Sequence, residues 1–99
     1  MNLCSLKSVR ECAKHLMDSE KKIHILINNA GVMMCPYKKT EDGYECQFQT
    51  NHLAHFLFTL YLLPKLKSSA DPEARIINVS ALAHAFKCNI SFLNDFINL

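Results

Sequence analysis

The sequence predicts an α/β fold in which helix, strand, helix and strand follow one another along the chain. Two short apolar runs, at 23–28 and 75–80, are rich in β-branched residues, and such runs are typical of strands buried on both faces of a parallel sheet. Two longer segments, at 6–19 and 44–67, place apolar residues at helical steps. A strand–helix–strand connection of this length makes the two strands parallel, with a right-handed crossover.

The first helix is predicted to begin after Ser5. A serine at this position can accept a hydrogen bond from a free N–H group of the first helical turn. Charged residues fill the positions between an apolar series at three- and four-residue steps, which consists of Leu6, Val9, Ala13, Leu16 and Met17. This pattern predicts an amphipathic helix of about four turns.

The second helix is predicted over 44–67, with its N-terminal cap near Thr40 or Asp42. Pro64 is the first strong helix breaker in this segment, so the helix is expected to bend there and also around residues 50–51. The segment has a broad apolar face, made of Phe48, Leu53, Phe56, Leu57, Leu60 and Leu63. After the second strand, the tail at 87–99 has no clear period and is predicted to be mostly loop.

Size and composition limit the classes of function. A chain of 99 residues favours a single domain, and a net charge of +2 with dispersed lysines argues against a nucleic-acid partner. The five cysteines include no CxxC pair, which favours a reduced intracellular compartment over a disulfide framework or a zinc ribbon. The densest apolar run, at 56–63, is far shorter than the roughly 20 residues of a membrane span, and no signal peptide is visible.

Both predicted strands end in asparagine, at Asn28-Asn29 and at Asn78. In open α/β sheets, ligands bind beyond the carboxyl ends of the strands. Gly31 lacks a β-carbon, so a ligand can approach its backbone closely, and the asparagine side chains can bond the neighbouring loop or strand. The alternative is that these residues only form turns, and the spacing alone leaves both interpretations open.

Two other constellations predict no site. His52, His55 and His84 find no convincing fourth ligand, so no metal site is predicted. Ser80 could be paired with His84 and Asp95 as a hydrolase triad, but no G-x-S-x-G nucleophile elbow surrounds it.

Three strings carry a resemblance to a known family. "INNAGVMMCPYKKTEDGYE", "NHLAHFLFTLYLLPKLK" and "ARIINVSALAH" occur in this order and resemble the short-chain dehydrogenases/reductases, in particular their retinol dehydrogenase-like branch. The resemblance implies a doubly wound Rossmann-type parallel sheet that binds NAD(H) or NADP(H). It covers the middle of that fold, so residues 1–99 are expected to form a single partial segment. The chain contains neither the family's Gly-rich phosphate loop nor its Tyr-x-x-x-Lys.

The resemblance also assigns residues to the cofactor. Asn29, Ala30 and Gly31 match positions along its adenosine half, and Val79 matches a strand end near the nicotinamide. Asn28 matches the asparagine that ties the central strands. Asn2 stands where the family usually has an aspartate that contacts the adenine, so the hydrogen bonding is expected to be kept in part and the charge to be lost.

Catalytic positions follow in the same way. Asn51 matches the helix asparagine that holds a water in the family's proton relay. Ala81 occupies the position of the serine that orients the substrate carbonyl, and the neighbouring Ser80 is an uncertain substitute because it points to the other side of a strand.

Two hypotheses of function follow. In the first, the chain is a segment of an oxidoreductase of lipophilic alcohols and carbonyls. It is inactive and weak in cofactor binding by itself, and a full-length form is compatible with membrane association. In the second, it is a non-catalytic remnant that associates with a full-length relative, or with a second copy, through the 44–67 helix.

Overall fold

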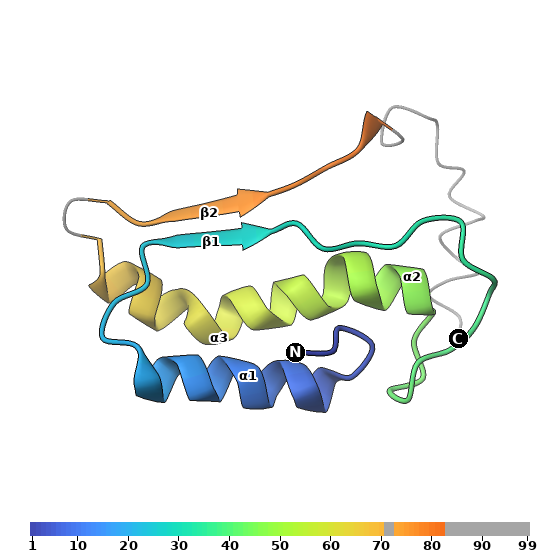
Figure 1. The fold of residues 1–99 in the computed structure, drawn as a ribbon, viewed down its shortest axis with the longest axis horizontal. Coiled ribbons are helices and arrows are strands. Elements are labelled where there is room, and N and C mark those ends of the chain that lie inside the picture. The colour runs from blue at the N-terminus through green and yellow to red at the C-terminus, as the bar shows by residue number, and fades with distance from the viewer. Residues whose placement is uncertain (71–72, 83–99) are drawn as a thin grey trace.

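The computed structural model describes residues 1–70 and 73–82, which form a layer of helices against a two-stranded sheet (Figure 1). Both long helices lie on the same side of the sheet. The elements in chain order are α1 (Leu6–Ser19), β1 (Ile25–Asn28), α2 (Cys46–Phe48), η1 (Gln49–Leu53), α3 (Ala54–Ser68) and β2 (Arg75–Asn78). The order of helix, strand, helix and strand is as predicted, while the predicted loop at 87–99 lies outside the described residues.

Hydrogen bonds stabilise both ends of helix α1, and some of them come from distant segments of the chain. The Oγ of Ser5 accepts a hydrogen bond from the N–H of Ser8, which confirms the predicted cap. The N–H of Leu6 donates to Oδ2 of Asp42 at 2.8 Å. At the other end, Nζ of Lys65 donates to the carbonyl oxygens of Met17 and Glu20, both at 2.6 Å. A lysine ammonium at this position stabilises carbonyl groups that have no partner within the helix.

The second helix runs without a break from α2 through η1 to α3 (Figure 1). The predicted cap at Thr40 or Asp42 is wrong, because Asp42 binds the start of α1 instead. Glu45 has an extended backbone, and its carboxylate accepts hydrogen bonds from the N–H groups of Gln47 and Phe48. The helix also continues through Pro64 to Ser68.

The irregularity expected around residues 50–51 is a π-helical turn, η1. The N–H of Ala54 bonds to the carbonyl of Gln49, five residues before it. Such turns are rare within α-helices and are frequent at functional sites. The turn changes the angular direction of every side chain that follows it, and these side chains include the ones that face the strands.

A fully buried glutamine joins η1 to the N-terminal segment and to the turn before α2. Nε2 of Gln49 donates to the carbonyl oxygen of Leu3 at 3.1 Å and to Oδ2 of Asp42 at 2.9 Å. Oε1 of Gln49 accepts from the hydroxyl of Thr40 at 2.6 Å. Because burying a polar group is costly unless it is paired, these bonds fix three chain segments relative to one another.

The apolar core lies between the two long helices and one face of β1. Its buried members are Val9, Ala13, Leu26, Ala54, Phe58, Leu62 and Leu66. The two alanines are fully buried and leave room for the helices to approach closely. No helix among residues 1–70 and 73–82 is long and apolar enough to cross a membrane.

The strands pair in parallel, as predicted, with Asn28 opposite Asn78. The N–H of Val79 bonds to the carbonyl of Asn28 and extends the ladder by one step. Strand β1 is shorter than expected at its start, because the N–H of Ile23 donates to Oγ of Ser69 instead of entering the sheet. The carboxyl ends of both strands therefore meet at one edge, where the asparagines lie.

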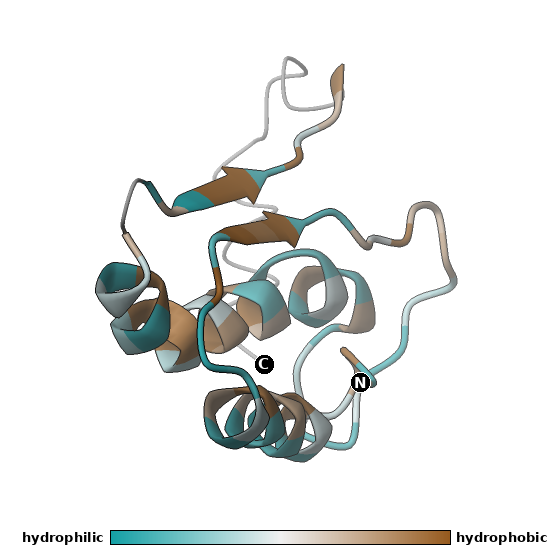
Figure 2. Cartoon of the chain, turned by 60° about the vertical axis from the view of Figure 1, so that its left-hand side comes forward, coloured by the Kyte–Doolittle hydropathy of each residue, from teal (hydrophilic) through white to brown (hydrophobic). Residues whose placement is uncertain are grey.

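The prediction that the strands are buried on both faces is wrong for the described residues. Leu26 and Asn28 face the helices and are buried, whereas Ile25 and Ile27 are 60% and 57% exposed. Figure 2 shows the strands as apolar ribbons above the helices. A continuous apolar run is compatible with a strand that is covered on one face or on both. The sequence of the run therefore does not show how many layers pack against the strand.

Candidate functional site

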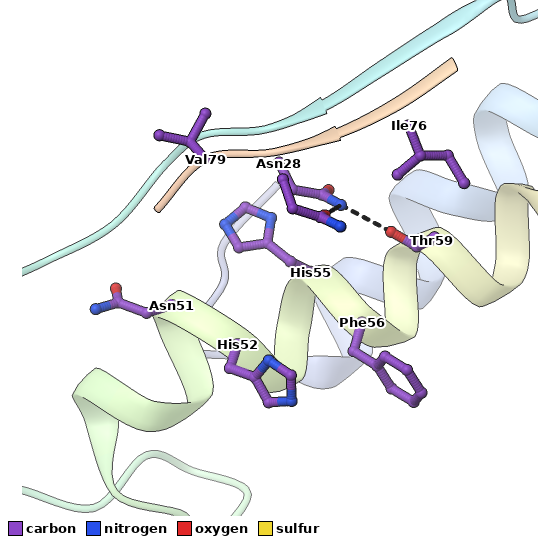
Figure 3. A pocket seen from close by; sticks show the side chains of 9 residues that line it. Asn28, Asn51, His52, His55, Phe56, Thr59, Ile76 and Val79 are labelled. Carbon is purple, nitrogen blue, oxygen red and sulfur yellow. Dashed lines mark hydrogen bonds between the residues drawn. The ribbon is translucent and has the colours of Figure 1, made fainter. Parts of the chain in front are cut away.

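Three polar side chains of the second helix face the end of β1 at four-residue steps. We call Asn51, His55 and Thr59 the polar stripe (Figure 3). The N–H of Val32 donates to Oδ1 of Asn51, and Nδ2 of Asn51 donates to the carbonyl of Val32, both at 2.8 Å. His52 and Phe56 project from a different side of the helix and not toward the end of β1.

The other two members of the polar stripe bind the chain at two-residue steps. Nε2 of His55 lies 2.7 Å from the carbonyl oxygen of Ala30, so the tautomer with a proton on Nε2 donates to it. Oγ1 of Thr59 accepts a hydrogen bond from Nδ2 of Asn28 at 2.9 Å. Residues 32, 30 and 28 are thus held in turn by residues 51, 55 and 59.

A match of lengths explains this register. Four helical residues rise by about 6 Å, and two extended residues span about 6.6 Å. The helix runs antiparallel to the chain that leaves β1, so Asn51 and His55 meet the backbone of Val32 and Ala30, and Thr59 meets the side chain of Asn28. The result is a segment that the helix holds at every second residue, where a strand end would otherwise form a free loop.

Asn28 ties the two strands together at this edge. Its Nδ2 donates to Oδ1 of Asn78 on β2 at 2.8 Å, in addition to its bond to Thr59. Its Oδ1 is buried and has no hydrogen-bond partner within the described part of the chain. A buried carbonyl oxygen without a partner is costly, and it offers an acceptor to a group that carries an N–H or O–H.

Two cavities flank the strand ends and share Asn28, Asn51 and Val79. The first, of about 500 Å³, lies between β2 and the helix and is lined in addition by His52, His55, Phe56, Thr59, Ile76 and Asn78. The second, of about 390 Å³, lies along the chain that leaves β1. Its remaining lining is Asn29, Ala30, Gly31, Val32, Met33, Gln47, Ser80 and Ala81.

The second cavity brings together the residues that the resemblance assigns to cofactor and catalysis, except Asn2. Residues 28–31, Asn51 and residues 79–81 all line it, although they come from three separate segments. Asn2 lines neither cavity. Its Oδ1 accepts a hydrogen bond from the N–H of Cys4 at 2.9 Å, ahead of α1.

The side chain of Asn51 lies against Gly31. A β-carbon at this position would lie 3.1 Å from Oδ1 of Asn51. The missing side chain was expected to admit a ligand, and its observed neighbour is the amide that binds Val32. Glycine at position 31 therefore allows the close approach of the polar stripe.

Replacing Gly31 with alanine should displace the Asn51 amide. The added methyl group sits closer to Oδ1 than ordinary contacts allow, so the bond to the Val32 N–H should weaken and this amide should exchange with solvent about tenfold faster. Amide exchange followed by NMR measures this directly.

Asn51→Ala supplies the control for the Gly31 substitution. In that background the obstructing oxygen is absent, so adding Gly31→Ala should leave the exchange rate of the Val32 amide unchanged. An additional effect of the same size in both backgrounds would show that Gly31 acts through its own backbone and not through Asn51.

His55 and Thr59 were missed as site residues by the sequence reasoning, which treated His55 as a surface histidine. The signal was their spacing of four and eight residues from Asn51, which places all three on one helix face. No cluster of three metal-ligating side chains occurs among residues 1–70 and 73–82. His84 and Asp95 lie outside the described residues.

Comparisons with known proteins agree on one family. The model of a family described as short chain dehydrogenase matches residues 1–91. Retinol dehydrogenase 12 of Mus musculus is 56% identical over 84 residues, which cover 85% of this chain and 26% of that protein. Retinol dehydrogenase 13 of Homo sapiens is 58% identical over 84 residues, covering 85% of this chain and 25% of that protein.

Two further similarities extend over almost the whole chain. Short-chain dehydrogenase TIC 32 A, chloroplastic, of Brassica napus is 46% identical over 101 residues, which cover 99% of this chain and 32% of that protein. The crystal structure of an uncharacterized protein from Mycobacterium Paratuberculosis matches with a TM-score of 0.75 and 42% identity, covering 95% of this chain and 32% of that one. The chain thus spans about a quarter to a third of the length of these relatives.

Proposed function

Because the chain belongs to the short-chain dehydrogenase family and is retinol dehydrogenase-like, we propose that the second cavity is part of an NADP(H) or NAD(H) site. The enzyme would be an oxidoreductase of lipophilic alcohols and carbonyls, of which this chain supplies the central segment. One observation carries the proposal. The polar stripe binds residues 28, 30 and 32, which line a cavity at the carboxyl ends of two parallel strands.

The residues present fit such a ligand. The cavity of about 390 Å³ has small residues, Ala30 and Gly31, on one side, so a flat or extended ligand can lie against their backbone. Asn28 also lines it, and its buried Oδ1 has no hydrogen-bond partner among the described residues. A bound nicotinamide cofactor would supply the hydride chemistry, and the chain's own part is to bind and orient.

Asn51 acts in this proposal as a positioning residue. Both polar atoms of its side chain bond to Val32, so its amide fixes the backbone that lines the second cavity. The water of a proton relay would have to use the second hydrogen on Nδ2 or the backbone of the widened turn η1. His55 supports the same edge one helical turn later through Ala30.

Ala81 should lower the turnover rate of the enzyme. It lines the cavity beside Ser80, and its methyl group can neither donate nor accept a hydrogen bond with a substrate oxygen. The substrate carbonyl would then rely on donors outside this chain. We therefore assign low turnover to any enzyme that carries alanine at this position.

By itself, the chain should bind NADPH too weakly to saturate at micromolar concentrations. It supplies one wall of the site, and its sequence contains no Gly-rich loop to hold the phosphates at a helix N-terminus. The same reasoning predicts no measurable retinol or retinal turnover by residues 1–99 alone. A reduced intracellular compartment suits the free cysteines of this proposal.

A hybrid enzyme tests the proposal. The 84 residues of this chain that match retinol dehydrogenase 12 of Mus musculus replace their counterparts there, which restores the flanking segments. The hybrid should bind NADPH, measured by quenching of protein fluorescence, whereas the isolated chain should not. Asn51→Ala should weaken this binding about tenfold, because the backbone at Val32 is then no longer fixed before NADPH binds.

His52→Ala is the matched control for Asn51→Ala. The two residues are adjacent on the helix, but the His52 ring packs between the rings of Phe48 and Phe56 and not toward the end of β1. Its loss should leave NADPH binding within about twofold of the parent hybrid. Equal weakening by both substitutions, or a folded hybrid without NADPH binding, would argue against the proposal.

One observation favours the second function, association without catalysis. The outer face of α3 exposes Phe56, Leu60 and Tyr61, which are 55%, 50% and 44% exposed. Apolar side chains gathered on a helix can pack against another chain. A hybrid that folds but fails to bind NADPH, together with an isolated chain that pairs with the full-length relative, would support this function over the first.

A further inference from the structure

Two thiols from distant segments lie in contact beside the start of the second helix. Sγ of Cys4 is 3.5 Å from Sγ of Cys46 and 3.3 Å from Oγ1 of Thr50. Cys4 precedes α1, and Cys46 is the first residue of α2. The bond from Gln49 to the carbonyl of Leu3 holds the two backbones beside each other, so the contact belongs to a fixed part of the fold.

The two cysteines differ in access. Cys4 is half-buried, while Cys46 is only 4% exposed. The hydrogen bond with Cys4 and the burial both raise the pKa of the Cys46 thiol above its ordinary value. Cys46 therefore stays protonated and shielded from solvent, and Cys4 is the sulfur that a small oxidant reaches first.

We propose that Cys4 and Cys46 form a redox modification site, at which a peroxide converts the two thiols into an intramolecular disulfide. The sulfur of Cys4 attacks one oxygen of hydrogen peroxide, the O–O bond breaks, and Cys4 sulfenic acid and water form. The sulfur of Cys46 then displaces the sulfenic oxygen as a second water and closes the S–S bond. The thiols lose two electrons and two protons, and the peroxide is reduced to two waters.

Closure needs little rearrangement. The sulfurs must approach from 3.5 Å to the roughly 2 Å of a disulfide, which side-chain rotation and a small backbone shift can supply. The product would join the segment before α1 to the helix that carries the polar stripe. This site does not depend on cofactor binding, so its test is independent of the proposed function.

The other cysteines provide internal controls. Cys12 and Cys35 are also free and half-buried, and Sγ of Cys35 donates to Oε1 of Gln47 at 3.6 Å. Neither contacts a second sulfur within the described ranges. Cys88 lies outside them. Tryptic cleavage after lysine and arginine places all five cysteines in different peptides, so each pairing can be recognised.

The experiment uses the 99-residue chain, fully reduced and then treated with hydrogen peroxide at a stoichiometric concentration. Remaining thiols are alkylated, the chain is digested without reduction, and the peptides are identified by mass spectrometry. We expect peptide 1–7 linked to peptide 40–65 at least about tenfold above any other pair, and loss of this preference in concentrated urea. Cys12→Ser and Cys35→Ser should leave the linked product unchanged.

Several outcomes would overturn the site. Pairings spread over all five cysteines, or the same pattern in buffer and in urea, would show that the fold does not select Cys4 and Cys46. Conversion of Cys4 to sulfinic acid without a linked peptide would show that Cys46 does not reach it. A product of unchanged yield in Cys46→Ser would assign the partner of Cys4 to another cysteine.

Discussion

The hybrid enzyme should reduce retinal about a hundredfold faster when Ala81 is changed to serine, because a hydrogen-bond donor aimed at a developing oxyanion is worth about 10²–10³ in kcat. Ala81 lines the cavity that also contains Gly31 and Asn51, so a hydroxyl at this position would point into the proposed site. The gain should appear in kcat, with the affinity for NADPH unchanged, because the added group serves the substrate and not the cofactor.

Ser80 provides the discriminating control for Ala81→Ser. If Ser80 already acts as the donor, Ser80→Ala should abolish the residual turnover of the Ala81 hybrid, and Ala81→Ser should add little. If it does not, Ser80→Ala should have a small effect in both backgrounds. Equal rates with alanine and serine at position 81 would remove this position from the catalytic set.

Gln49→Leu should lower the free energy of unfolding of the hybrid by about 2 kcal/mol, because it leaves half-buried polar groups without partners while it keeps the volume of the side chain. The groups that lose a partner are the carbonyl of Leu3 and the hydroxyl of Thr40. Asp42 loses one bond and keeps the one to the N–H of Leu6. Urea unfolding of both proteins measures the difference.

Gln47→Leu is the matched control for Gln49→Leu. Gln47 lies two residues earlier and is only half-buried, and its side chain accepts one long hydrogen bond from the thiol of Cys35. Its substitution should cost less than about 1 kcal/mol. Similar losses for the two variants would mean that burial of the polar groups around Gln49 is not what makes this position important.

The sequence predicted the fold where local pattern is sufficient. The apolar steps of α1, the Ser5 cap and the parallel pairing of β1 with β2 are all present. The match to the short chain dehydrogenase family and the similarity to a solved chain agree with a partial Rossmann-type α/β segment. Local pattern was not sufficient at Asp42, which binds α1 and not the helix that follows it. Which helix a capping side chain binds depends on tertiary contacts, and the spacing of residues in the sequence does not show these contacts.

The candidate site was predicted in part for the same reason. Parallel strands bring their ends to one edge, so the neighbourhood of Asn28 and Asn78 follows from topology, as does the position of Gly31 beside it. The roles of His55 and Thr59 depend on the helix phase after the π-helical turn. A polar residue on a helix most often faces solvent, and only the position of the helix over the strand shows otherwise.

The match between the polar stripe and the chain that leaves β1 also restricts how the length of this protein can change. One residue inserted between Asn51 and His55 would turn everything after it by about 100° around the helix axis, and Thr59 would lose Asn28. One residue inserted at 29–31 would invert the side chains beyond it and shift them by about 3.3 Å. Neither partner can change in length alone. A change of length leaves the polar stripe undisturbed only in the connection between the two partners, where no bond of the polar stripe is formed.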